Sequence, residues 1–207
     1  MKRLTTHEQL EIEIKSLIVL EPRFGVVHRK HGTPSLRGAD ANLETLLMIV
    51  TEQFLSLKAA AAIWRRLADA IGPISSDAVL ASKPERLMEL GLSGAKAKCF
   101  HACAAAPLDF AAAPEDLRES LLDIWGIGPW TADIFMLTAI GHADAWPTGD
   151  LALQTAAQNL LNLKARPNAR KMEEIAMAWQ PHRATAARLL WAHYRGLNGL
   201  PQAPSQN

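Results

Sequence analysis

Residues 121–140, LLDIWGIGPWTADIFMLTAI, contain two helical apolar patterns separated by Gly126, Ile127, Gly128 and Pro129. Glycines permit a sharp backbone reversal, and proline suits the first turn of the helix that follows. The sequence therefore predicts a tight hairpin between two helices. The second helix would present its first amides with no bulky side chain in front, and such an end attracts anions, phosphate above all. A plain antiparallel helix connection is the alternative.

The rest of the chain is also expected to be helical, because alanine and leucine are abundant and alternating β-branched runs are missing. Thr6 can cap a helix that reaches about Leu20, and Ser56 can restart a helix after residues 52–55. A loop rich in glycine, proline and basic residues is expected over residues 22–40. Further helices are expected within residues 42–71, 82–92, 94–106, 114–125, 129–140, 150–163, 168–179 and 181–196.

Composition limits the functional classes. The 207 residues include two cysteines, Cys99 and Cys103, so a four-cysteine cluster cannot form within this chain. We expect both to be buried small side chains, in a reducing, cytoplasmic setting. No apolar run reaches the roughly 18 residues of a membrane span. The net charge is only +1, so any contact with nucleic acid has to be local, through a few side chains or backbone amides.

A lone acid, Asp150, follows Gly149 in the stretch AWPTGDLALQ, at the start of another helical run. Aspartate at that position is a good N-cap. A carboxylate at a helix start can also point into a cleft and take part in chemistry. The residues alone leave both roles open.

Together, LLDIWGIGPWTADIFML and AWPTGDLALQ resemble the helix-hairpin-helix, the Gly/Pro-rich loop and the aspartate of the base-excision DNA glycosylase superfamily. The DNA-3-methyladenine glycosylase II type is the most similar branch. Residues 31–67 and 178–196 extend the similarity, which covers roughly residues 25–196. The resemblance implies an all-α, two-lobed helical DNA glycosylase fold with no iron–sulfur cluster. The expected parts are a central lobe over 40–136, a second lobe from 1–39 plus 141–200, and a flexible tail over 201–207.

By this resemblance Asp150 is the catalytic residue. A purine alkylated on a ring nitrogen is cationic and leaves without further protonation. Its departure develops oxocarbenium character on the sugar, which a single carboxylate can stabilise while it positions or deprotonates water. The expected activity is therefore hydrolysis of the N-glycosidic bond of alkylated purines, of the 3-methyladenine and 7-methylguanine class, which leaves an abasic site.

Bifunctional members of the superfamily carry a lysine where this chain has Trp130, and tryptophan cannot form a Schiff base. The resemblance therefore implies a monofunctional enzyme without lyase activity. Trp130 would offer a π face to the cationic base, with Ile134 and Trp146 lining the same pocket. Core packing is the alternative for Trp130 and Trp146, and packing is also expected of Trp179 and Trp191. His182 lies where relatives often place an aromatic, and the alternative is a surface histidine.

The remaining expected contacts are with the duplex, from which the target base must be flipped. Gln53 and Phe54 are expected at a helix junction, as a wedge that fills the vacated space and contacts the opposed base. A buried Phe54 and a solvated Gln53 are the alternatives. The hairpin residues Gly126, Ile127, Gly128 and Thr131 would bind the DNA backbone. Lys96 and Lys98 would touch phosphates, unless they lie on a solvated face.

Relatives can also hold a monovalent cation at hairpin carbonyls, here those of Gly126 and Gly128, and no other cofactor or side-chain metal site is expected. The expected partner is double-stranded DNA with damaged bases, with no membrane, no obligate protein partner and nothing that requires a dimer. Two rival interpretations are a non-enzymatic helix-hairpin-helix DNA-binding protein and a glycosylase of the same fold for other damaged bases. A neutral lesion would need polar partners, and Asp133 is the candidate, unless it is a surface acid.

Overall fold

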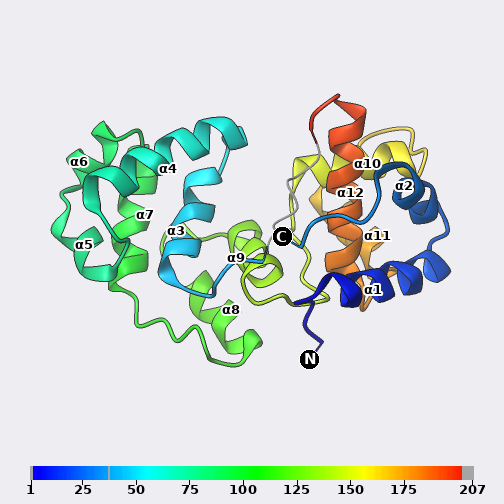
Figure 1. Ribbon diagram of the computed structural model, residues 1–207, viewed down its shortest axis with the longest axis horizontal. Coiled ribbons are helices and arrows are strands. Elements are labelled where there is room, and N and C mark those ends of the chain that lie inside the picture. The colour runs from blue at the N-terminus through cyan, green and yellow to red at the C-terminus, as the bar shows by residue number, and fades with distance from the viewer. Residues whose placement is uncertain (1, 37, 202–207) are drawn as a thin grey trace. The chain divides into compact units, whose positions relative to one another are not determined.

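The computed structural model describes residues 2–36 and 38–201 (Figure 1). Within them, secondary structure is helical apart from one isolated β-bridge, between Arg3 and His142, so the predicted all-α class is confirmed. Most of the predicted tail, residues 202–207, lies outside the described residues. The helices are α1 (His7–Leu20), α2 (Arg23–His31), α3 (Leu43–Glu52), α4 (Leu57–Ile71), α5 (Ser76–Ala81), α6 (Pro84–Glu89), α7 (Gly94–Ala105), α8 (Pro114–Leu122), α9 (Pro129–Thr138), α10 (Leu151–Leu160), α11 (Ala169–Met177) and α12 (Arg183–Leu197).

Local capping chemistry sets many of the helix starts. Thr6 and Gln9 form a reciprocal capping box at the start of α1, as the sequence predicts. Ser56 accepts the backbone amide of Ala59 and begins α4, which confirms the predicted restart. Pro114 occupies the first turn of α8. These starts were predictable because each depends on residues within one turn of the cap.

The loop expected over residues 22–40 is wrong in its first half, where α2 forms. Its apolar side chains Phe24 and Val27 are buried, while its last turn consists of basic residues. Positive side chains near a helix C-terminus are favourable because they face the negative end of the helix dipole. Gly32 then ends the helix with a φ of 72°. The basic composition that suggested a loop therefore belongs to the exposed side and the C-terminal end of a short helix.

The chain divides into two compact units. Residues 39–135, here called the hairpin unit, contain α3 to α8 and residues 129–135 of α9. Its centre is α7, which packs on α3, α5 and α6 (Figure 1). Phe100 and Ala97 of α7 are completely buried, and Leu46 and Leu87 are buried on the packing helices.

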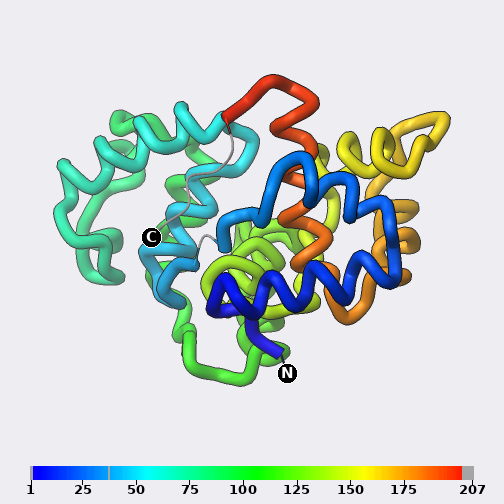
Figure 2. Tube along the Cα trace, turned by 45° about the vertical axis from the view of Figure 1, so that its right-hand side comes forward, coloured from blue at the N-terminus to red at the C-terminus, as the bar shows by residue number. Residues whose placement is uncertain are grey.

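The second unit, here called the aspartate unit, combines residues 1–38 with residues 136–207. Its centre is α12, which packs on α10, α2 and α1 (Figure 2). Arg188, buried on α12, donates to the carbonyl oxygens of Ala184, Leu36 and Leu137 at 3.2, 3.3 and 2.9 Å. Burial lowers the pKa of its guanidinium to about 10. The side chain thus ties α12 to the chain before residue 39 and to the end of α9.

Candidate functional site

The predicted hairpin lies between α8 and α9, and its two glycines serve different purposes. Gly126 has a φ of 91°, and a Cβ there would lie 2.8 Å from both Cβ and Sγ of Cys99 on α7. Of the two glycines, only Gly126 has a positive φ. A Cβ on Gly128 would meet no described atom within 4 Å. Packing therefore requires Gly126 to be a glycine, whereas nothing within the described fold requires it of Gly128.

The hairpin rests on α7, which supplies the two predicted cysteines and a lysine. Cys99 and Cys103 are buried with their sulfurs 3.9 Å apart, which confirms the expectation of buried thiols. Lys98 places its Nζ 4.0 Å from the ring centroid of Trp125, directly before Gly126. The Trp125 side chain is 48% exposed. Sequence reasoning missed Trp125, although an aromatic directly before the hairpin was a signal that could have identified it.

The start of α9 is anchored to α8 by an ion pair. Arg118 Nε donates to Asp133 Oδ1 at 2.7 Å, and Asp133 is only 5% exposed. The hydrogen bond to Asp133 raises the pKa of Arg118. The interpretation of Asp133 as a surface acid is therefore wrong. On the same helix Thr131 and Ile134 are buried, whereas Trp130 is partly exposed.

The carbonyl of Gly128 accepts the amide of Ala132 at 3.1 Å, which is the first helical hydrogen bond of α9. This carbonyl oxygen keeps a second lone pair, and the monovalent cation expected at the carbonyls of Gly126 and Gly128 stays a prediction. No reaction step is assigned to such a cation. Among residues 2–36 and 38–201, no three His, Cys, Asp or Glu side chains gather as a metal site would require.

The predicted wedge lies in residues 53–56, between α3 and α4, here called the wedge loop. Phe54 has a φ of 56°, in the left-handed region that bulky residues rarely adopt, and its side chain is 103% exposed relative to an extended reference. The alternative of a buried Phe54 is therefore wrong. Gln53 Nε2 donates to Thr131 Oγ1 at 2.7 Å, so Gln53 is also not merely solvated. The structure thus joins the wedge loop to the first turn of α9.

The two predicted phosphate-binding lysines lie in different environments. Lys96 Nζ donates to the carbonyl oxygens of Thr51 and Gln53, at 2.9 and 2.7 Å, and burial lowers its pKa. Lys98, two residues further along α7, is exposed and lies over Trp125. Lys96 therefore binds the wedge loop, and Lys98 lies beside the hairpin.

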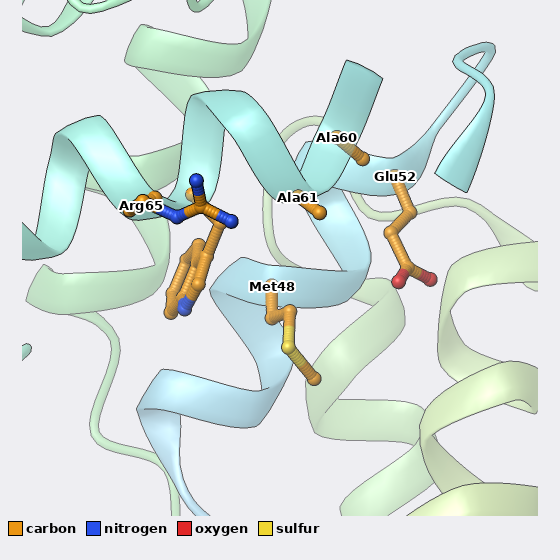
Figure 3. A pocket seen from close by; sticks show the side chains of 6 residues that line it. Met48, Glu52, Ala60, Ala61 and Arg65 are labelled. Atoms are coloured by element: carbon orange, nitrogen blue, oxygen red, sulfur yellow. The ribbon is translucent and has the colours of Figure 1, made fainter. Parts of the chain in front are cut away.

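A groove of about 350 Å³ follows α3 and α4 beside the wedge loop (Figure 3). Glu52 and Arg65 lie at its two ends, and its middle is apolar, with Met48, Ala60 and Ala61. Trp64 completes the lining. None of the site residues predicted from the sequence lines this groove.

Asp150 caps α10 in the aspartate unit. Its Oδ1 accepts the amide of Leu153 at 2.9 Å, which confirms the N-cap role. The preceding Gly149 has a φ of 83° and turns the chain into the cap. Asp150 as a residue remains partly exposed. Two features, the turn and the capping bond, therefore fix the orientation of this side chain without burying it.

The remaining predicted aromatic, Trp146, belongs to an aromatic cluster within the aspartate unit. Trp146 is 5% exposed and packs edge-on against Trp179, with ring centroids 5.8 Å apart. Phe24 packs against the other side of the cluster, 5.1 Å from Trp179. The packing expected of Trp179 is confirmed, and the packing alternative also accounts for both the burial and the contact of Trp146.

His182 precedes α12 and is not a surface histidine. Its Nδ1 pairs with Glu13 Oε2, and the completely buried Glu13 also binds Lys2. Burial raises the pKa of Glu13, but hydrogen bonds from Lys2 and His182 outweigh this effect and place the pKa below its ordinary value. His182 therefore pairs with a buried glutamate at the position where the sequence resemblance suggested an aromatic.

A helix-hairpin-helix in one helical unit and an aspartate that caps a helix in another define a class of DNA repair proteins. Residues 47–182 match the model of the HhH-GPD superfamily of base excision DNA repair proteins. The chain belongs to this superfamily, and the resemblance inferred from the sequence is confirmed. Within the described residues, no helix is long and apolar enough to cross a membrane.

The relatives of this chain include proteins named for alkylated bases. It is 28% identical over 122 residues to the alkylbase DNA glycosidase-like protein mag2 of Schizosaccharomyces pombe, covering 55% of this chain and 57% of mag2. It is 32% identical over 79 residues to the putative DNA-3-methyladenine glycosylase YfjP of Bacillus subtilis, covering 38% of this chain and 28% of YfjP. The chain therefore spans little more than half the length of one relative and less than a third of the other.

Solved structures show the same fold over most of the chain. The DNA-3-methyladenine glycosidase of Bacillus halodurans is 26% identical, with a TM-score of 0.73, over 90% of this chain and 91% of that one. Mag1 of Schizosaccharomyces pombe, a 3-methyladenine DNA glycosylase solved with abasic DNA, is 22% identical. Its TM-score is 0.73 over 92% of this chain and 97% of Mag1. At that identity the match to Mag1 establishes the fold alone.

Proposed function

We propose that this protein is a monofunctional DNA glycosylase that removes alkylated purines from double-stranded DNA and leaves an abasic site. The observation that carries the proposal is Asp150, a partly exposed residue whose carboxylate is oriented by the N-cap hydrogen bond at the start of α10. Asp150 lies within the residues that match the superfamily model, it follows the hairpin in sequence, and the relatives described above are named for alkylated bases.

The chemistry asked of Asp150 is limited because the leaving group is already cationic. Loss of the base leaves positive charge on the sugar, and one carboxylate stabilises that charge and orients or deprotonates the attacking water. Leu153 holds one carboxylate oxygen, so the side chain need not reorganise as charge develops. A second acid is required only for a poor leaving group, which an alkylated purine is not.

The hairpin would hold the DNA backbone. The first amides of an α-helix have no partner within the helix and form an anion site. At α9 the residue before Pro129 is Gly128, and the space around its missing side chain is open. That space would admit a phosphate to the helix end, and Lys98 beside the hairpin would add one positive charge. Local contacts of this kind suit a chain with a net charge of +1.

Trp130 would recognise the flipped base. It follows Pro129 in the first turn of α9 and keeps part of its surface exposed. A cationic purine gains both stacking and cation–π attraction on an indole face, whereas a normal base gains only stacking. Ile134, one turn further along the helix, would extend the apolar wall. Phe54 would fill the space that the flipped nucleotide leaves, with Gln53 beside the opposed base.

The test is chromatography of free bases released from methylated duplex DNA by the wild type and by Asp150→Asn. Asparagine caps helices as well as aspartate does, and Asn42 and Asn168 already cap α3 and α11. The substitution therefore removes the charge and preserves the cap. We expect the wild type to release methylated purines and the variant to lose at least about 100-fold in rate. Asp77→Asn, an exposed acid of α5, serves as the control.

Two results would overturn the proposal. Equal release by wild type and Asp150→Asn would remove Asp150 from the chemistry. Binding to DNA without release of any base would favour a non-enzymatic DNA-binding protein. Monofunctionality has its own test, because a lyase is trapped on abasic DNA by borohydride through a Schiff base. We expect no trapped complex from the wild type, and a covalent adduct would disprove this part of the proposal.

A further inference from the structure

The loop that carries Phe54 is held from two sides by residues of the hairpin unit. From α7, the ammonium of Lys96 binds the carbonyl oxygens of Thr51 and Gln53. From α9, Thr131 accepts a hydrogen bond from the side chain of Gln53. Phe54, directly after these anchors, has no buried surface of its own to hold it. The conformation of Phe54 therefore depends on contacts made by its neighbours.

The position of Lys96 is chemically specific. Its charge lies at the C-terminal end of α3, where the last carbonyls of a helix lack partners and carry partial negative charge. Both hydrogen bonds are charge-assisted, and they compensate for the burial that lowers the pKa of the amine. Lys98, in contrast, keeps its ammonium exposed. Two lysines two residues apart on α7 therefore have different environments and partners.

A clamp is required because Phe54 is unfavourably placed when the protein is free. A φ of 56° is strained for a phenylalanine. Burial of the fully exposed phenyl ring would lower the free energy of the protein, because it removes apolar surface from water. An apolar groove with Met48, Ala60 and Ala61 lies on the two helices that this loop joins (Figure 3). A loosened loop could relieve the strain and lay the ring against this apolar surface.

We propose that Lys96 is a positioning residue that clamps residues 51–53, so that Phe54 is held outward, ready to enter a DNA duplex. The inference rests on the proposed function, because it assigns Phe54 its role as a wedge. The sequence suggested that Lys96 contacts a DNA phosphate, whereas this proposal gives Lys96 a contact inside the protein. Lys96 itself need not touch DNA.

The first experiment uses the free protein and needs no activity. Lys96→Met keeps the aliphatic stem and removes the ammonium, and Lys83→Met, at an exposed lysine of the same unit, is the control. Hydrogen exchange is measured at the amides of Gln53 and Leu55, which bond to Val50 and Glu52 within the loop region. We expect about tenfold faster exchange at these amides in Lys96→Met, with helix α7 unchanged, and no change in Lys83→Met. Unchanged loop exchange in Lys96→Met would overturn the inference.

The second experiment follows release of 7-methylguanine from a duplex and from the same strand alone. A wedge matters only where a base must leave a stack, so Lys96→Met should reduce the rate about tenfold on the duplex and little on the single strand. In a Phe54→Ala background the lysine substitution should have no further effect on duplex release, because both act through one side chain. Equal reductions on both substrates, or additive reductions on the duplex, would contradict the clamp.

Salt dependence separates the clamp from direct binding of a phosphate. Binding to a duplex with an abasic-site analogue is measured between about 50 and 200 mM salt. If Lys96 bound a DNA phosphate, Lys96→Met would reduce the slope of log K against log salt by about one. We expect the slope to stay unchanged, and a reduction would show that Lys96 binds phosphate after all. If the wild type releases no base, the proposed function fails, while the exchange experiment still decides whether Lys96 holds the loop.

Discussion

Phe54 concentrates two unfavourable features in one residue. The backbone is left-handed at a position without a glycine, and the ring contributes no buried surface to the fold. Such a residue destabilises the free protein, and strained residues of this kind cluster at functional sites. The proposed wedge is such a function, because an exposed ring is available to a duplex.

The strain at Phe54 predicts an unusual order of stability. Phe54→Ala should leave the free energy of unfolding within about 0.5 kcal/mol of the wild type, because the ring packs against nothing. Phe54→Gly should be about 0.5–1 kcal/mol more stable than Phe54→Ala, because glycine adopts positive φ without a steric penalty. Denaturant unfolding of the three proteins measures this order. A decrease above about 2 kcal/mol in Phe54→Ala would mean that the ring is buried in solution.

How well single residues could be predicted depended on the sequence distance of their partners. Asp150 could be singled out as an N-cap because Leu153, its capping partner, is three residues away. The partners Gln53 and Thr131 are 78 residues apart in sequence, and His182 and Glu13 are 169 residues apart. No local sequence pattern predicts contacts over such separations. Lys96 could be chosen from the sequence as a candidate for binding, but its carbonyl partners are 43 and 45 residues away.

At the scale of elements, the hairpin between α8 and α9 shows why two glycines in one short motif are not equivalent. Packing on α7 requires a glycine at Gly126, whereas no contact among the described residues requires a glycine at Gly128. Sequence patterns cannot separate these cases, because both appear as glycine beside a helix. The helices themselves were largely predictable, since caps and prolines act within one turn. α2 and α5 were not predicted, and at α2 the polar surface and basic end concealed the buried side.

A matched pair of substitutions separates the two glycines. Gly126→Ala should reduce the free energy of unfolding by about 3 kcal/mol, because it combines positive φ with a Cβ pressed against Cys99. Gly128→Ala should change it by less than about 1 kcal/mol. Affinity for abasic duplex should nevertheless fall about tenfold in Gly128→Ala, because the methyl group occupies the space proposed for a phosphate. Thermal unfolding and DNA binding of both variants test this, and normal binding by Gly128→Ala would contradict the proposed anion site.

For the molecule as a whole, acid stability should depend on the buried Glu13. A carboxyl whose pKa is lowered in the folded state stabilises that state above its unfolded pKa, near about 4.3, and this contribution disappears as pH falls through the folded value. Glu13→Gln should therefore be about 2 kcal/mol less stable at pH 7, and this deficit should shrink below about pH 4. Glu119→Gln, an exposed acid, is the control. A deficit independent of pH would show that the carboxylate charge is not what stabilises the fold.

The near-neutral chain predicts a weak salt dependence of DNA binding. With a net charge of +1, affinity rests on few phosphates, and we expect a slope of log K against log salt of about −3 to −4 on abasic duplex. Lys98→Met should make the slope less negative by about one. Titrations at several salt concentrations measure both values. A slope near about −8 would point to a broad basic surface and contradict the local contacts proposed at the hairpin.

The hairpin unit is continuous in sequence, whereas the aspartate unit is formed by two segments that flank it. During synthesis the ribosome releases α3 to α8 as a complete set, but α1 and α2 emerge first and must wait for α12. Until then the apolar side chains of α1, including Leu10, Ile14 and Leu17, lack the central helix of their unit. Domains generally fold as units during translation. We therefore expect the nascent chain to order its hairpin unit first and to leave the apolar side of α1 exposed to chaperones until α12 has been synthesised.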